Sequence, residues 1–189
     1  MNQENHKIED IIRIFDDCFA TEYNTRLERG GDYPIYLPAF LEEDGVKSER
    51  HYNVILFAHG YYSSALHEIA HWLVAGEERR KLEDFGYWYE PDGRSAERQR
   101  EFESAEVKPQ AIEWVLATAA GFRYFASADN LSGNPGDNSA FKQAVFEQVK
   151  TYAERGYLPK RAETLRKALC AFYGTPDVID LKQFNIERI

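Results

Sequence analysis

The sequence has few of the features that mark secreted or membrane-spanning proteins. Its two cysteines, Cys18 and Cys170, are too few and too far apart for the disulfide framework of a small secreted domain. No apolar run approaches the roughly 20 residues that a membrane span needs. The N-terminal segment also lacks the basic-then-apolar order of a signal peptide. We therefore expect buried thiols in a cytoplasmic protein.

Positive charge is also scarce. The chain has 23 lysines and arginines against 32 aspartates and glutamates, which gives a formal net charge of −9. Such a surface repels phosphate groups, so neither nucleic acid nor an anionic membrane is expected as a partner. The charge is compatible with a cationic substrate, or with a macromolecule that presents a local positive group.

Apolar and aromatic residues, in contrast, are plentiful. They make up 43% and 14% of the 189 residues, with 12 tyrosines and 12 phenylalanines. This length and composition predict one globular domain, residues 1–189, with a single core. Some of the aromatic rings exceed what a core needs, and we expect them to line a pocket.

Apolar periodicity predicts several amphipathic helices. They cover residues 8–19, 139–155 and 161–173, with a break between Gly156 and Pro159. Residues 96–120 have a helical pattern on both sides of Pro109. Proline is tolerated in the first turn of a helix and disruptive later, so either a new helix begins near Pro109 or one helix kinks there.

Strand signals are fewer and all precede the histidine-rich part of the sequence. Residues 33–40 contain two prolines and predict an edge strand or an extended segment. Residues 52–57 predict a short buried strand, whereas residues 42–50 and 129–138 have the polar composition of loops. The fold class expected from these elements is α+β, mostly helical, with a small β-sheet ahead of a metal-binding helix.

The segment His67-Glu68-Ile69-Ala70-His71 lies in a helical pattern that begins after Ser63 or Ser64, as N-cap, and ends near Gly76. Residues four apart on a helix are about 40° from each other, so the two histidines share a face and can bind one ion. Two histidines can also form an ordinary hydrogen bond in a core. The glutamate between them favours the metal site.

Two histidines leave at least one protein ligand to be found, and the acids of the next helical segment are the candidates. Glu106 is the preferred third ligand because it could lie on a helix that packs against the first. Glu103 and Glu113 are its rivals.

Aromatic and acidic residues on both sides of the motif suggest how a substrate is held. His59 follows the buried strand and is expected to contact the substrate, together with Tyr62, Tyr87 and Tyr89. Aromatic rings hold alkylammonium groups through cation–π contacts, and Asp92 or Glu68 could neutralise such a group.

Two kinds of chemistry use two histidines and one carboxylate. In zinc hydrolases the neighbouring glutamate, here Glu68, acts as general base on a metal-bound water. In non-haem Fe(II) oxygenases the same three ligand types leave positions open for dioxygen and substrate. The spacing of the motif favours the hydrolase without excluding iron.

Four stretches of the sequence resemble the bacterial elongation factor P hydroxylase family, and their order and spacing match it along essentially the whole chain. They are residues 57–62 (FAHGYY), 65–72 (ALHEIAHW), 84–94 (DFGYWYEPDGR), and 102–103 (FE) with 106–111 (EVKPQA). The resemblance implies a monooxygenase that hydroxylates the β-lysylated lysine of translation elongation factor P, on a fold with a zincin-like metal site.

Carried onto this sequence, the resemblance implies that His67, His71 and Glu106 bind non-haem Fe(II), with dioxygen as co-substrate and Glu68 as an acid or base beside the metal. Zinc or another divalent metal is not excluded. Two readings stay open: a zincin-like zinc metallopeptidase with Glu68 as general base, and a structural metal site in a module that binds a translation factor. The native metal, the electron donor, any need for 2-oxoglutarate and the hydroxylated carbon are not determined by the sequence.

Overall fold

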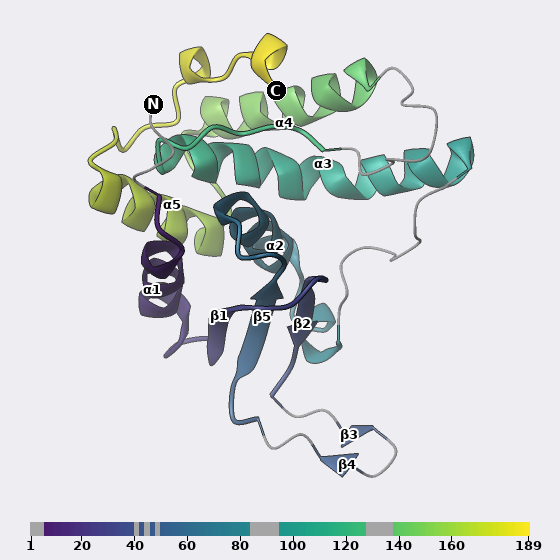
Figure 1. Ribbon diagram of the computed structural model, residues 1–189. Coiled ribbons are helices and arrows are strands. Elements are labelled where there is room, and N and C mark those ends of the chain that lie inside the picture. Colours follow the sequence, from purple (N-terminus) through teal and green to yellow (C-terminus); the bar gives the residue numbers. More distant parts are fainter. Residues whose placement is uncertain (1–5, 40–41, 44–45, 48–49, 84–94, 128–137) are drawn as a thin grey trace. The chain divides into compact units, whose positions relative to one another are not determined.

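The computed structural model of the chain describes residues 6–39, 42–43, 46–47, 50–83, 95–127 and 138–189, and its main helices and strands are labelled in Figure 1. The helices are α1 (Ile8–Phe19), α2 (Tyr62–Val74), α3 (Ala96–Ala119), α4 (Ser139–Arg155) and α5 (Lys160–Tyr173), with short 3-10 helices η2 (Arg79–Lys81), η3 (Leu181–Gln183) and η4 (Ile186–Arg188). The strands are β1 (Thr25–Arg29), β2 (Ile35–Leu37), β3 (Glu42–Glu43), β4 (Val46–Lys47) and β5 (Asn53–Phe57). The expected fold class, α+β and mostly helical with a small sheet, is confirmed. None of the described helices has the length and apolar character needed to cross a bilayer.

The chain divides into two compact units, Met1–Gly86 and Tyr87–Ile189. In the first unit, β5 lies at the centre of a three-stranded sheet with the order β1-β5-β2. It pairs in parallel with β1, where Thr25 lies opposite Asn53, and antiparallel with β2. The proline-flanked segment therefore forms an edge strand, as expected. The central strand of the sheet is the one predicted at residues 52–57.

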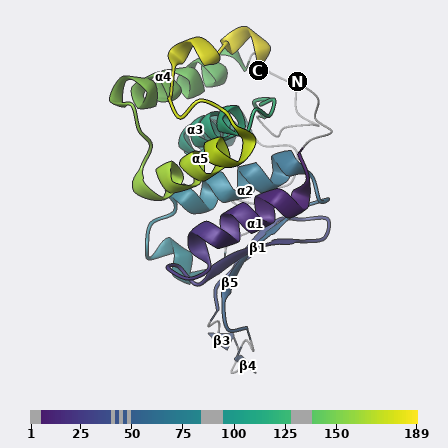
Figure 2. The same cartoon turned by 90° about the vertical axis from the view of Figure 1, so that its left-hand side faces the viewer.

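Helices α1 and α2 cover this sheet, and α2 follows β5 directly (Figures 1 and 2). An aromatic cluster holds the two helices together. The Trp72 ring centroid lies 5.4 Å from that of Phe15 and 5.0 Å from that of Phe19, and all three side chains are buried. Because Trp72 is anchored in this cluster, the rotation of α2 about its own axis is set by core packing.

The start of α2 differs from the expectation. The helix begins at Tyr62, with Tyr61 as its N-cap, and neither Ser63 nor Ser64 caps it. The Ser64 hydroxyl instead accepts a hydrogen bond of 3.1 Å from the Ala58 backbone N–H. The serine therefore ties the helix back to the end of β5, a role that local sequence preference cannot distinguish from capping. The other end, at Val74, lies close to the expected Gly76.

The expectation of a plain loop at residues 42–50 was wrong. Strands β3 and β4 form an antiparallel pair in which Glu42 lies opposite Lys47 and Glu43 opposite Val46. Each strand has two residues, which is too short for any alternation of polar and apolar residues to show in the sequence.

In the second unit, α3 packs against α4 and α5. The structure has one continuous helix from Ala96 to Ala119, so no new helix begins at Pro109. The chain then reverses at Gly121, whose φ of +65° is a left-handed conformation that glycine adopts without strain. The predicted helices at 139–155 and 161–173 are confirmed, and Gly156 ends α4 in the left-handed conformation. Both cysteines are free thiols; Cys170 is buried and Cys18 half-buried.

Candidate metal centre

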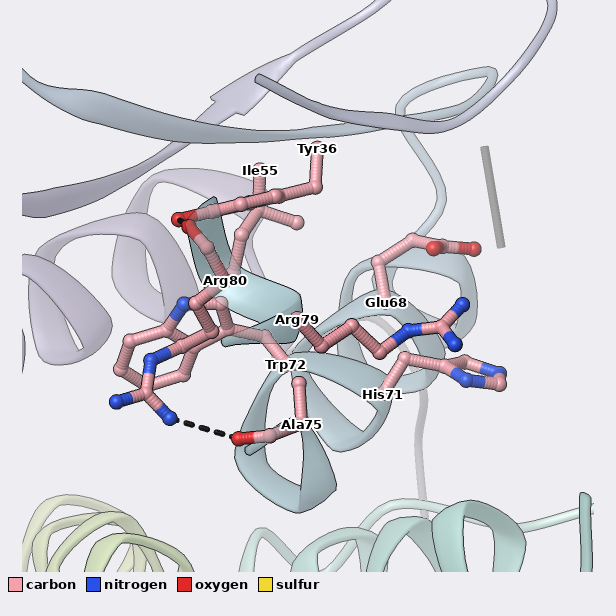
Figure 3. Close-up of a pocket in the computed structure, with 8 residues that line it drawn as sticks. All are labelled: Tyr36, Ile55, Glu68, His71, Trp72, Ala75, Arg79 and Arg80. Atoms are coloured by element: carbon pink, nitrogen blue, oxygen red, sulfur yellow. Dashed lines mark hydrogen bonds between the residues drawn. The ribbon is translucent and has the colours of Figure 1, made fainter. Parts of the chain in front are cut away.

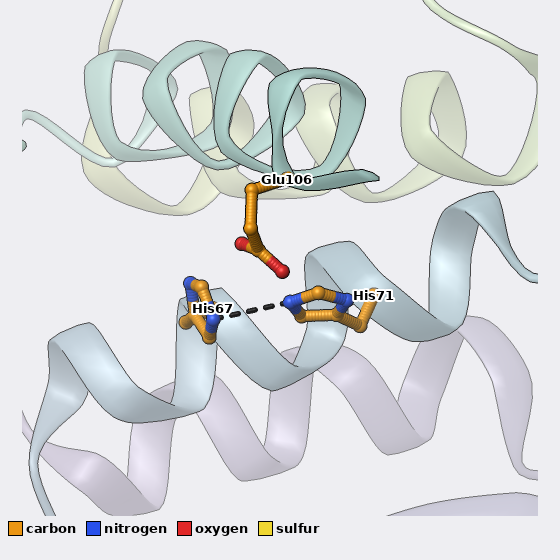
Figure 4. A group of neighbouring side chains, drawn as sticks. All are labelled: His67, His71 and Glu106. Carbon is orange, nitrogen blue, oxygen red and sulfur yellow. Dashed lines mark hydrogen bonds between the residues drawn. The ribbon is translucent and has the colours of Figure 1, made fainter. Parts of the chain in front are cut away.

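The two histidines of the motif lie side by side on α2. The Nε2 atoms of His67 and His71 are 3.1 Å apart, and their ring centroids are 4.6 Å apart (Figure 4). Both side chains are half-buried, whereas Ile69, Ala70 and Trp72 are buried in the core. The helix thus uses one face for packing and presents both imidazoles on another.

The spacing of the two nitrogens fits a shared metal ion. Imidazole nitrogens bind zinc and similar ions at about 2.1 Å. Two such bonds, at an angle between the octahedral and tetrahedral values, place the nitrogens roughly 3.0–3.4 Å apart. The observed 3.1 Å between His67 and His71 falls in this range. The same separation is also that of a hydrogen bond between the two Nε2 atoms, so the distance is compatible with a shared ion without requiring one.

Glu68 and His71 also line a small open pocket of about 30 Å³ within the first unit (Figure 3). Its other lining residues are Tyr36, Ile55, Trp72, Ala75, Arg79 and Arg80. Arg80 is held in place because its guanidinium donates a 2.7 Å hydrogen bond to the Ala75 carbonyl, while its own carbonyl accepts one of 2.9 Å from the Tyr36 hydroxyl. Figure 3 shows the side chains of Glu68, His71 and Arg79 extending to the same side. The glutamate of the motif is thus half-buried at a pocket wall, where it can accept or donate a proton.

The three candidates for the third ligand lie on α3, in the second unit. Two of them are buried and one is half-buried. Glu106 is 2% exposed and Glu113 is 8% exposed. Glu103 is only half-buried and accepts a hydrogen bond of 3.0 Å from Gln99. A carboxylate as buried as Glu106 needs hydrogen bonds or a cation to offset the cost of leaving water.

Part of that compensation comes from Gln110, one turn further along α3. Its Nε2 donates a hydrogen bond of 3.2 Å to Oε2 of Glu106. Its Oε1 accepts one of 2.9 Å from the Tyr124 hydroxyl and one of 3.2 Å from the Ser127 backbone N–H. Burial raises the pKa of Tyr124 well above its usual range, and the charges of Glu113 and Glu106 raise it further. This buried network was not expected from the sequence; its only signal was the helical spacing of residues 106 and 110.

The residues expected to contact the substrate have different surroundings. His59 is exposed in the turn between β5 and α2, with a left-handed φ of +55° that is uncommon outside glycine. Its ring lies 5.8 Å from that of the exposed Tyr61. Tyr62 is 5% exposed, and its ring centroid lies 5.2 Å from that of His6 in an edge-to-face arrangement. The other three expected contacts, Tyr87, Tyr89 and Asp92, lie outside the described residues.

Comparison with known proteins places the amino-acid sequence in a family. Residues 14–184 match the family described as Elongation factor P hydroxylase. A protein of Haemophilus influenzae named Elongation factor P lysine hydroxylase is 74% identical over 184 residues, which are 97% of this chain and 99% of the relative. The chain belongs to the elongation factor P hydroxylase family. The family resemblance inferred from its motifs is confirmed.

Membership of the elongation factor P hydroxylase family gives the histidine motif a context beyond its five residues. The matched region includes all of α2, all of α3 and the sheet strands β1, β2 and β5. The HExxH helix and the helix that carries Glu106 therefore both lie within the region that matches the family.

Proposed function

We propose that this chain is a hydroxylating oxidoreductase that adds one oxygen atom to a lysine of translation elongation factor P, in its β-lysylated form. The observation that carries the proposal is the 74% identity, over nearly the full length of both chains, to the relative named Elongation factor P lysine hydroxylase. In this proposal residues 1–189 work as one metal-dependent hydroxylase domain.

The metal ligands in the proposal are His67, His71 and Glu106. The proposal is supported within each unit by the 3.1 Å separation of the two imidazole Nε2 atoms on α2, and by the burial of the Glu106 carboxylate on α3, which is 2% exposed. Two imidazoles and one carboxylate suit non-haem Fe(II), and also zinc. Bound Fe(II) would supply the activation of dioxygen, which neither imidazole nor carboxylate can provide alone.

The remaining site residues are assigned to the handling of substrate and protons. Glu68, at the wall of the pocket beside His71, holds or releases a proton. His59 and Tyr62, with Tyr87, Tyr89 and Asp92, position the substrate arm. The strained turn at His59 supports its part in this assignment, since left-handed non-glycine residues cluster at functional sites. Orienting the correct methylene toward the metal is the main task of such contacts.

The proposal is tested by mass spectrometry of β-lysylated elongation factor P after aerobic incubation with the Fe(II)-loaded protein. We expect a gain of one oxygen atom on the modified lysine. His67→Ala is expected to abolish both the gain and metal binding, whereas His51→Ala, which removes an exposed histidine outside the motif, should leave both intact. An unchanged substrate under all reductants tried would reject the hydroxylase assignment.

A zinc metallopeptidase is the second candidate, and the HExxH order with Glu68 beside His71 favours it. It predicts stoichiometric zinc and cleavage of peptides, with Glu68 as general base. Peptide cleavage by the zinc-loaded protein, without oxygen transfer by the iron-loaded one, would favour this candidate over the hydroxylase.

A further inference from the structure

Gln110 is a buried residue of α3 whose side-chain amide forms several hydrogen bonds. Its side-chain amide is 1% exposed and makes four hydrogen bonds. A buried amide offers two donor hydrogens and two acceptor lone pairs. All four are used, so no other orientation of this amide would satisfy its surroundings equally well.

The orientation of the amide follows from Ser127. The Ser127 backbone N–H can only donate, and it contacts Oε1 of Gln110 at 3.2 Å. The Ser127 carbonyl can only accept, and it contacts Nε2. Turning the amide over would place donor against donor and acceptor against acceptor. The Ser127 backbone thus determines which atom of the Gln110 amide, Nε2 or Oε1, faces Glu106.

With the amide held this way, Nε2 is the atom that faces Glu106. It donates to Oε2 of the carboxylate, while the Tyr124 hydroxyl must donate to Oε1 of Gln110. The hydrogen bonds therefore run in one direction, from Tyr124 through Gln110 to Glu106. Residues 106 and 110 are four apart on α3, so this contact follows from the helix itself.

We propose that Gln110 is a positioning residue that fixes the orientation of the Glu106 carboxylate for metal binding. The hydrogen bond from Nε2 to Oε2 restrains the carboxylate, and Tyr124 and Ser127 keep the amide aligned. This inference rests on the proposed function only in taking Glu106 as a metal ligand. Hydrogen-bond partners of this kind typically contribute 10- to 100-fold to metal affinity.

The test is an anaerobic titration of the metal-free protein with cobalt(II) chloride, followed by visible absorption, which reports both affinity and coordination. Gln110→Met keeps the approximate size of the side chain and removes its hydrogen bonds. We expect its cobalt dissociation constant to rise about 10- to 100-fold, with altered absorption bands. Tyr124→Phe removes only the hydroxyl and is expected to raise the constant by a smaller factor than Gln110→Met does, because Tyr124 acts on Glu106 only through Gln110.

Tyr152→Phe is the matched control, since Tyr152 is a buried tyrosine of α4 outside this network. We expect wild-type affinity and bands from it. Thermal unfolding of each metal-free variant shows whether it is folded. If Gln110→Met does not fold, Tyr124→Phe decides the question. Folded variants at Gln110 or Tyr124 with wild-type cobalt affinity and bands would overturn the positioning role.

His67→Ala distinguishes this failure from failure of the proposed metal site. If His67→Ala loses cobalt binding while the Gln110 and Tyr124 variants bind normally, only the positioning role is wrong. If His67→Ala itself binds cobalt as the wild type does, the assignment of the metal ligands is wrong as well.

Discussion

Glu68 is the single residue at which the two candidate chemistries differ most. It lies half-buried at a pocket wall next to His71. A zinc hydrolase uses this carboxylate as general base, whereas the proposed hydroxylase needs it only to manage a proton or the substrate charge.

Glu68→Gln therefore tests the proton-handling role of this residue in the proposed hydroxylase. We expect metal stoichiometry to be unchanged, because the proposed ligand residues remain, and hydroxylation of elongation factor P to fall by about 100-fold or more. Metal content and oxygen gain measured on the same samples provide the check. A variant that has lost its metal would show that Glu68 is itself a ligand, contrary to the assignment.

For single residues, the sequence could predict that the two proposed ligands on α2 lie side by side, but not the hydrogen-bond network around Glu106. His67 and His71 are four residues apart on one helix, so their proximity follows from helix geometry alone. Gln110 acquires its role from Tyr124 and Ser127, which reach it only because the chain turns back after α3. Contacts that depend on such a reversal leave no periodic signal in the sequence.

Among the helices and strands, amphipathic periodicity was sufficient to predict α1 and α4 at their observed bounds. It was insufficient for β1, which no pattern indicated. Only Thr25 and Leu27 of this five-residue strand are buried, and three of its residues are charged. Its place in the sheet comes from pairing with β5, which lies 28 residues further along the chain.

Gly156 tests how much the end of one helix contributes to stability. It ends α4 at a φ of +77°, and a Cβ built there meets no atom within 4 Å. The cost of Gly156→Ala is therefore conformational and not steric, and we expect about 1 kcal/mol. Gly156→Asn should cost less, since asparagine tolerates the left-handed region. Urea unfolding measures both; equal losses for the two variants would contradict this explanation.

The ion pairs of α5 predict a pH dependence. Arg166, 3% exposed, donates to Glu163 at 2.7 Å and also pairs with Asp177. Burial alone would raise the pKa of Glu163, but the hydrogen bond from Arg166, together with one from the Leu158 N–H, outweighs burial and lowers that pKa. A lowered folded-state pKa means that the carboxylate stabilises the fold above about pH 4.5, and that this contribution is lost as pH falls through the folded value.

Glu163→Gln should therefore destabilise the protein by about 2 kcal/mol at pH 7, since a hydrogen bond to a charged partner is replaced by a weaker one. The difference from the wild type should shrink below about pH 4.5. Urea unfolding at a series of pH values provides the measurement. A difference that stays constant down to pH 3 would show that Glu163 acts through packing and not through its charge.

At the scale of the whole molecule, the net charge of −9 predicts how the substrate associates. The β-lysylated lysine arm of the proposed substrate carries ammonium groups, which an acidic protein attracts over a distance set by salt screening. We expect the KM for the modified factor to rise at least about threefold between 50 and 300 mM sodium chloride, with kcat nearly unchanged. Sucrose at matched osmolarity is the control. A KM independent of salt would assign recognition to short-range contacts alone.

The parallel pairing of β1 with β5 also has a consequence for how the polypeptide matures. Thr25 must meet Asn53, which lies 28 positions further along the chain, and closing a loop of this length slows folding. A 13-residue helix such as α2 is marginally stable in water until it packs, here against β5 and the rings of α1. The two imidazoles would then reach their final spacing only after the sheet closes. Metal acquisition at the proposed site would accordingly be a late step in the folding of the chain.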